Sequence, residues 1–154
     1  MDSERYELAQ VNISRLRFPL ESTELKDFVE ALEPVNATAD AAEGFVWRLE
    51  SEGGDATEIR IFEDDWLIVN MSVWRDAESL KAFIYAGRHR DLLKRRNEWF
   101  ERVAEAMTAL WWVPEGHRPG VREAEERLTL LREQGPTERA FTLRAEFPAP
   151  GAEG

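Results

Sequence analysis

Two residues of one predicted helix could take part in chemistry, a histidine and an arginine that lie seven positions apart. Between residues 88 and 103, Leu92 and other apolar residues gather on one arc of a helical wheel. His89 and Arg96 fall near the middle of that arc, so both side chains are expected to point inward. Histidine exchanges protons near neutral pH, and a buried guanidinium requires an anionic or carbonyl partner.

Two interpretations of this pair follow. In the functional one, Arg96 binds an anionic or carbonyl ligand and His89 acts as an acid–base group or a metal ligand. In the structural one, Arg96 pairs with a buried carboxylate or carbonyls, and His89 is a core histidine with satisfied hydrogen bonds. Residues 88–102 hold six basic and three acidic residues, which suits either an anion-binding face or a solvated face.

A second set of candidate residues occupies alternate positions of predicted strands. In the strand expected at residues 67–74, apolar residues alternate with Asn70, Ser72 and Trp74. Asn12 holds an equivalent position in the N-terminal strand. Polar groups beside an indole favour a cavity wall or a dimer interface, because a sheet face open to water would suit the Trp poorly.

The remaining candidates are tryptophans and a second histidine. Trp111 and Trp112 are adjacent in a predicted strand, so one belongs to the core and the other needs a pocket or a partner surface. His117 lies in a loop, where it either joins His89 in a site or has a surface role. The two histidines lack the spacing of metal ligands, and no metal site is predicted. Trp99, on the helix of His89, is a further pocket candidate.

Strands and helices alternate along the chain and must position these residues. The strands are expected at residues 6–18, 45–50, 67–74, 108–113 and 141–147, and helices at 22–32, 76–86, 88–106 and 121–134. Pro34 is expected to interrupt the first helix and to open a second short turn. A β-α-β-β-α-β core predicts an α+β fold, a ferredoxin-like antiparallel sheet with helices on one face. The other face is expected to be solvated or covered by a partner.

Composition excludes several classes of protein. The chain has 154 residues, a formal net charge of -11 and no Cys, so disulfide frameworks, thiolate metal sites and a Cys nucleophile are excluded. The acidic charge argues against nucleic-acid binding. We expect one domain over residues 6–147 and a disordered tail over 148–154.

The sequence also bears on location. The N-terminus lacks the basic start and apolar stretch of a signal peptide, and the longest apolar run is Ala109 to Val113. That run is far shorter than the ~20 residues that span a bilayer. A cytoplasmic protein without membrane contact is expected.

Five stretches match a known family together, residues 8–13, 40–47, 69–74, 89–100 and 110–117. They resemble a bacterial family catalogued as a domain of unknown function, in the dimeric α/β-barrel group that includes the antibiotic-biosynthesis monooxygenases. The resemblance covers residues 6–148 and implies a homodimer in which an open sheet face meets a second copy. Gly120 stands where the family pattern has a helix-capping Thr. The resemblance places at motif positions Asn12, Asn36, Trp47, Asn70, Trp74, His89, Arg96, Trp99, Trp112 and His117.

Three functions are compatible with these residues. The first is an enzyme, such as a cofactor-free monooxygenase acting on an aromatic or carbonyl substrate, with His89 and Arg96 as catalytic groups. Its ligand pocket would comprise Asn12, Asn70, Ser72, Trp74, Trp99, Trp112 and His117. The second is a non-catalytic dimeric protein that binds a small molecule or serves as an accessory factor. The third is a haem protein with His89 as axial ligand, although no cofactor is the primary expectation.

Overall fold

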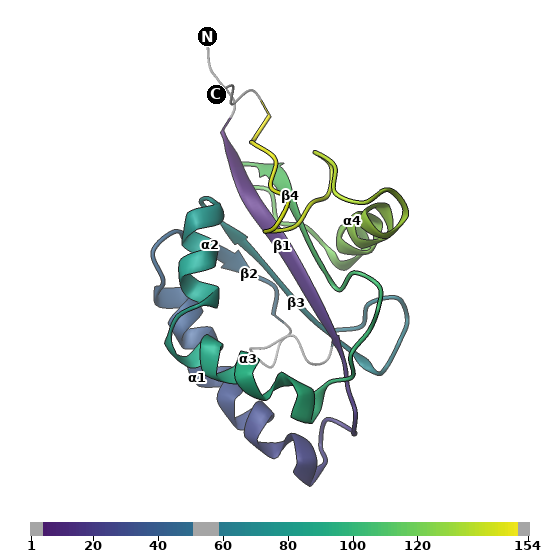
Figure 1. Cartoon of the computed structure of the whole chain (residues 1–154). Coiled ribbons are helices and arrows are strands. Elements are labelled where there is room, and N and C mark those ends of the chain that lie inside the picture. Colours follow the sequence, from purple (N-terminus) through teal and green to yellow (C-terminus); the bar gives the residue numbers. More distant parts are fainter. Residues whose placement is uncertain (1–4, 51–58, 151–154) are drawn as a thin grey trace.

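Figure 1 shows the computed structural model of the chain, which describes residues 5–50 and 59–150. Its strands are β1 (Tyr6–Arg15), β2 (Phe45–Arg48), β3 (Leu67–Trp74) and β4 (Thr108–Pro114). Its helices are η1 (Thr23–Leu25, a 3-10 helix), α1 (Lys26–Ala41), α2 (Ala77–Ile84), α3 (Gly87–Trp99) and α4 (Val121–Gln134). No helix among the described residues is long and apolar enough to cross a membrane.

The four strands form one sheet in the order β2-β3-β1-β4, and every neighbouring pair is antiparallel. This order, with helices between β1 and β2 and between β3 and β4, is the ferredoxin-like arrangement. The predicted α+β class and ferredoxin-like sheet are therefore confirmed. β1 lies in the interior of the sheet, where Ala9 pairs with Val73 on one side and with Trp111 on the other.

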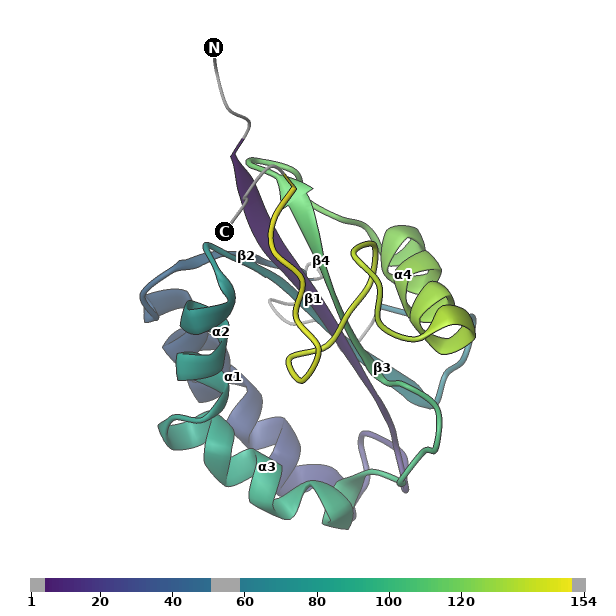
Figure 2. The same ribbon diagram turned by 45° about the horizontal axis from the view of Figure 1, so that its top comes forward.

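The two faces of the sheet are covered by different helices, as Figure 2 shows. Helices α1, α2 and α3 lie on one side and α4 on the other. We call the side of Leu8, Trp74 and Leu110, which pack with α2 residues, the α2 face. The opposite side, which packs with Ala124 and Leu128, is the α4 face.

The chain itself buries the middle of the α4 face. Val11, Met71 and Trp111 are completely inaccessible to solvent beneath α4 and the segment that contains Ile61. Sequence reasoning expected this face to meet solvent or a second copy, because a local pattern does not say which face a helix covers. The predicted homodimer would therefore have to form through another surface while α4 stays in place.

Three predicted elements differ from the structure. The helix expected to reach residue 106 ends at Trp99, because Phe100 adopts an extended conformation and pairs with Leu16 of the chain after β1. Pro34 lies inside a continuous α1, whose buried Phe28 and Val35 hold both halves of the helix against the core.

The strand expected at 141–147 is reduced to a bridge between Phe141 and Leu110, followed by a turn that Thr142 and Ala145 close. The predicted domain boundary at residue 147 and the disordered tail stay predictions, and residues 151–154 lie outside the described residues.

Candidate functional site

A row of hydrogen-bonded polar side chains crosses the α2 face. The alternation of β1 and β3 places these side chains on the face, and their antiparallel register aligns Gln10 with Ser72. Gln10 Nε2 donates to Asn70 Oδ1 at 2.8 Å and to Ser72 Oγ at 2.9 Å. Trp74 Nε1 also donates to Ser72 Oγ, at 2.8 Å. Gln10 and Ser72 are buried, so this row is a fixed part of the fold.

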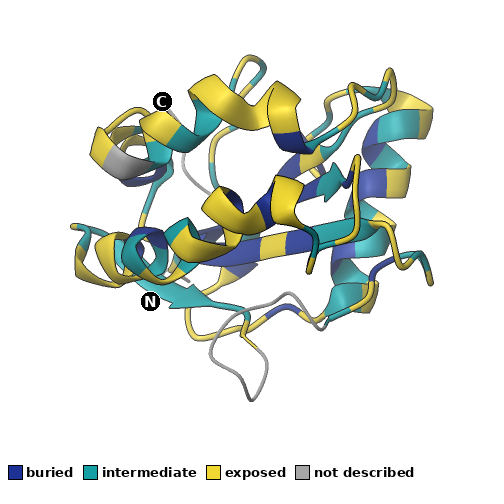
Figure 3. Cartoon of the chain, turned by 90° about the horizontal axis from the view of Figure 1, so that it is seen from below, coloured by how far each residue is buried: buried dark blue, intermediate teal, exposed yellow. Residues whose placement is uncertain are grey.

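Solvent reaches one end of the row. Asn12, Asn70 and Thr108 are exposed although they lie on the sheet face beneath the helices, and Thr108 Oγ1 donates to Asn12 Oδ1 at 2.8 Å. The reason is that α3 packs mainly against α1 and α2 and scarcely touches the strands. In Figure 3, seen from below, exposed residues interrupt the buried stretches of a sheet strand. A solute can therefore approach the row from this end.

Aromatic rings line the other end of the row. The buried Trp74 indole stacks on Phe83 of α2 with ring centres 5.3 Å apart, and Phe45 meets the indole edge-on at 5.5 Å. Phe83 in turn contacts the imidazole of His89, 5.0 Å away. Asp76 positions α2, because its carboxylate accepts from Ser79 N at 2.9 Å and caps the helix.

His89 lies in the first turns of α3 and is largely shielded from solvent. Its Nδ1 lies 3.1 Å from the carbonyl oxygen of Ile84, which can accept a hydrogen bond from that nitrogen when it is protonated. Burial lowers the pKa of His89 below its ordinary value, and the hydrogen bond to Ile84 opposes that shift only in part. The imidazole is therefore neutral at pH 7, with the proton on Nδ1 and a lone pair on Nε2.

The lowered pKa of His89 predicts a pH-dependent stability. The unfolded chain takes up a proton at His89 near pH 6.5, and the folded chain does so only at lower pH. The free energy of unfolding should therefore fall as the pH drops below about 6.5, and it should fall less in His89→Gln. Urea unfolding at several pH values between about 7.5 and 5.5 measures how steeply the free energy of unfolding changes with pH in each protein. Equal slopes in the two proteins would contradict a shielded, neutral His89.

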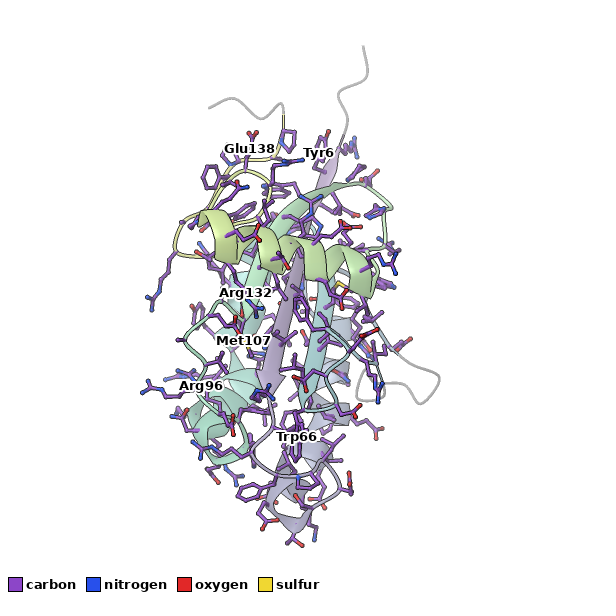
Figure 4. The ribbon with its side chains drawn as sticks, turned by 90° about the vertical axis from the view of Figure 1, so that its right-hand side faces the viewer. Tyr6, Trp66, Arg96, Met107, Arg132 and Glu138 are labelled. Carbon is purple, nitrogen blue, oxygen red and sulfur yellow. The ribbon has the colours of Figure 1, made fainter. Side chains whose placement is uncertain are left out.

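Arg96 is exposed, so the expectation that its guanidinium is buried in the core is wrong. The helical wheel does place it on the side of His89, seven residues along α3, but α3 stands apart from the strands. Among the described residues, none forms a hydrogen bond or ion pair with its side chain. Arg96 lines a hollow of about 300 Å³ together with Arg90 and Lys94. Figure 4 shows Arg96 well away from α4.

The other predicted site residues are dispersed. Trp99 is buried in an apolar cluster with Leu25 and Phe28, where α3 meets α1. Trp112 does lie on the α2 face, but its Nε1 donates to the carbonyl oxygen of Phe147. Asn36, a motif position, is half-buried on α1.

His117 is separated from His89 by the sheet. Its Nε2 lies 2.7 Å from Glu123 Oε1 at the start of α4, and Glu123 Oε2 accepts from Trp111 Nε1. Trp111 belongs to the α4 face, so the two tryptophans do point to opposite faces as predicted. His117 therefore takes no part in a site with His89. Trp47, another motif position, also packs on the α4 side.

Sequence reasoning missed two residues of the site. Gln10 connects the row, and its place two residues before Asn12 on the same strand face was visible in the alternation. Phe83 is the second, and nothing in the sequence indicates that it lies between Trp74 and His89.

A groove between α1 and α2 is a separate hollow of about 870 Å³. Small side chains such as Ala37, Ala41 and Ala82 form much of its wall, and Phe83 lines it as well. Phe83 therefore lies between this groove and His89. None of the site residues predicted from the sequence lines it.

Residues 7–154 match the family described as Domain of unknown function (DUF3291). The chain belongs to this family. The match covers the whole polar row as well as His89 and Arg96, and it confirms the resemblance to a domain-of-unknown-function family. A search among curated proteins gives no match.

Several solved structures are similar to the chain. A conserved protein from Methanosarcina mazei Go1 is 11% identical, with 70% of this chain and 90% of that chain covered and a TM-score of 0.49. A protein from Pseudomonas aeruginosa is 9% identical, with 75% of this chain and 100% of that chain covered and a TM-score of 0.48. SnoaB, a cofactor-independent oxygenase from Streptomyces nogalater, is 13% identical, with 77% and 98% covered and a TM-score of 0.45.

Proposed function

We propose that the chain binds a small aromatic or carbonyl-bearing molecule between the α2 face of the sheet and helices α2 and α3. One observation carries this proposal: a polar row that starts at the exposed Asn70 ends on the Trp74 indole, which stacks on Phe83. Ligand sites combine apolar walls with a few directed polar groups in this way. The exposed end of the row supplies the entrance.

His89 is the acid–base group of this proposed site. Its Nδ1 is directed to a backbone carbonyl, so Nε2 is the atom that can accept a proton from a bound molecule. The lowered pKa keeps that nitrogen unprotonated at pH 7. A neutral base suits the cofactor-free oxygenase chemistry expected from the sequence, in which the protein stabilises a substrate anion.

A non-catalytic binding protein is the second candidate. The position of Arg96 favours it, because the guanidinium is exposed and is not held in place by any described residue. A catalytic cation is normally fixed by neighbouring groups. Binding that survives unchanged in both His89→Gln and Arg96→Gln, with no turnover in any of the three proteins, would support this second candidate.

The residues around His89 do not fit a haem group. Phe83 packs on the imidazole, with the two rings inclined by 54°, and the groove of about 870 Å³ has no His89 in its wall. A haem needs a flat slot that opens on the ligating nitrogen. We therefore derive no chemistry through haem.

A blocking substitution tests where a ligand binds. Asn12→Trp puts a large side chain into the exposed end of the site, and Thr129→Trp puts the same side chain on the exposed side of α4. Small aromatic compounds that raise the melting temperature of the original protein should lose that effect in Asn12→Trp and keep it in Thr129→Trp. Stabilisation that persists in Asn12→Trp would contradict the proposed site.

A further inference from the structure

We infer that Phe83 limits the length of the ligand, because its ring is the wall between the proposed site and the groove between α1 and α2. This inference rests on the proposed function and specifies its ligand class. The ligand is a compact aromatic molecule whose ring end stops at Phe83, and the groove beyond that ring is space that the ligand does not enter.

Phe83 lies where two faces of α2 meet. Ser79 and Ala82 belong to one stripe of the helix, and both line the groove. Leu80 and Ile84 belong to the neighbouring stripe, which packs on the α2 face of the sheet. Phe83 belongs to both stripes, since it lines the groove and also packs with the residues of the α2 face.

The groove offers open space on one side of the Phe83 ring. Ala37 and Ala41 of α1 and Ala82 of α2 line this hollow of about 870 Å³. Alanine side chains leave space between two helices that larger side chains would fill. The volume is within the range of roughly 300–1,000 Å³ that is typical of ligand pockets. Removal of the Phe83 ring should therefore extend the proposed site into a space that can hold a further ring.

The proposed site lies on the other side of the ring. Phe83 stacks on Trp74 and contacts His89, and neither of those two residues lines the groove. Asn70 and Trp74 are four residues apart on β3, which corresponds to about 13 Å of strand. A ligand that enters at Asn70 and lies along β3 therefore meets Phe83 at the far end of the site.

Two probes that share a headgroup and differ in length test the inference. They are 2-naphthoate and 6-phenyl-2-naphthoate, which carries one more ring at the end opposite the carboxylate. The carboxylate keeps its hydration at the exposed end of the site, so the added ring points toward Phe83. The original protein should bind the longer probe about tenfold more weakly or worse, because Phe83 leaves no room for that ring.

Phe83→Ala should reverse this selectivity. The ratio of the two dissociation constants should change by about tenfold or more in favour of the longer probe, because its added ring is then buried in the groove. Ala37→Trp, added to Phe83→Ala, refills the groove from α1 and should restore the preference for the shorter probe. Phe83→Leu retains more of the packing, and its ratio should shift in the same direction even if Phe83→Ala does not fold.

Phe45→Ala is the matched control. Phe45 packs on the same indole as Phe83, at 5.5 Å, but does not line the groove. Weaker support of Trp74 affects both probes alike, so the ratio in Phe45→Ala should equal that of the original protein. NMR gives a second measurement, since the longer probe bound to Phe83→Ala should shift the backbone amide signals of Ala37 and Ala82.

The outcomes separate the ligand length from the site itself. An unchanged ratio in the Phe83 variants, or an equal change of the ratio in Phe45→Ala, would overturn the inference. If Asn12→Trp still abolished the binding of 2-naphthoate, the proposed site would stand without the length limit. Failure of both probes to bind, or binding of 2-naphthoate that Asn12→Trp leaves intact, would contradict the site and the inference together.

Discussion

Leu128→Asp should lower the free energy of unfolding by about 4 kcal/mol or more, which is enough to unfold many domains of this size. Leu128 is completely buried where α4 packs on the sheet, among residues such as Val11 and Met71. A carboxylate there loses its hydration without gaining a partner. Urea unfolding followed by circular dichroism measures the loss.

Thr129→Asp is the matched control for that substitution. Thr129 is the next residue of α4 and is exposed, so the same change should alter the free energy of unfolding by only about 0.5 kcal/mol. Similar values for the two variants would show that α4 does not cover the sheet. Further contacts hold α4 on the sheet, including the hydrogen bond of 2.8 Å that Arg132 of α4 donates to the carbonyl oxygen of Ala106. Figure 4 shows Arg132 beside Met107, which follows Ala106 in the chain.

Trp74→Ala should also have a large effect, lowering the free energy of unfolding by about 3–5 kcal/mol. Trp74 is 1% exposed, stacks on Phe83, meets Phe45 edge-on and donates to Ser72. Its removal leaves a large cavity and also withdraws the ring that supports Phe83, which in turn supports His89. The variant should therefore lose stability and ligand binding together.

Trp74→Phe separates the two roles of this indole. Phenylalanine retains much of the ring packing but removes the hydrogen bond to Ser72, so the expected cost is about 1–2 kcal/mol. Unfolding curves of the three proteins give the comparison. If Trp74→Ala lowered the free energy of unfolding no more than Trp74→Phe does, the indole would not be a packing element of the α2 face.

The parts of the fold that local pattern determines could be predicted from the sequence. The amphipathic segment before Gly135 predicted a helix over residues 121–134, and α4 has those bounds. The alternation in β3 correctly placed Asn70, Ser72 and Trp74 on one face. The period at which apolar residues recur and the residues that form turns are local properties of the chain, and they are sufficient to predict these elements.

Other parts depend on packing between distant segments. A helical wheel gives the direction of Arg96 around α3 but not the distance between α3 and the sheet, so the exposure of Arg96 could not be predicted. Gln10 bonds to a residue 60 positions away in the sequence, a pairing that the register of β1 and β3 alone determines. The side of the sheet that α4 covers was unpredictable for the same reason.

The most direct test of the central claim is a titration of ¹⁵N-labelled protein with 2-naphthoate, followed by NMR. A ligand on the α2 face should shift the indole Nε1–H signal of Trp74 and the side-chain amide signals of Asn70 and Gln10. The indole signal of Trp111, on the α4 face, should stay in place. Shifts confined to Ala37 and Ala82 of the α1–α2 groove, with Trp74 and Asn70 unchanged, would contradict the account.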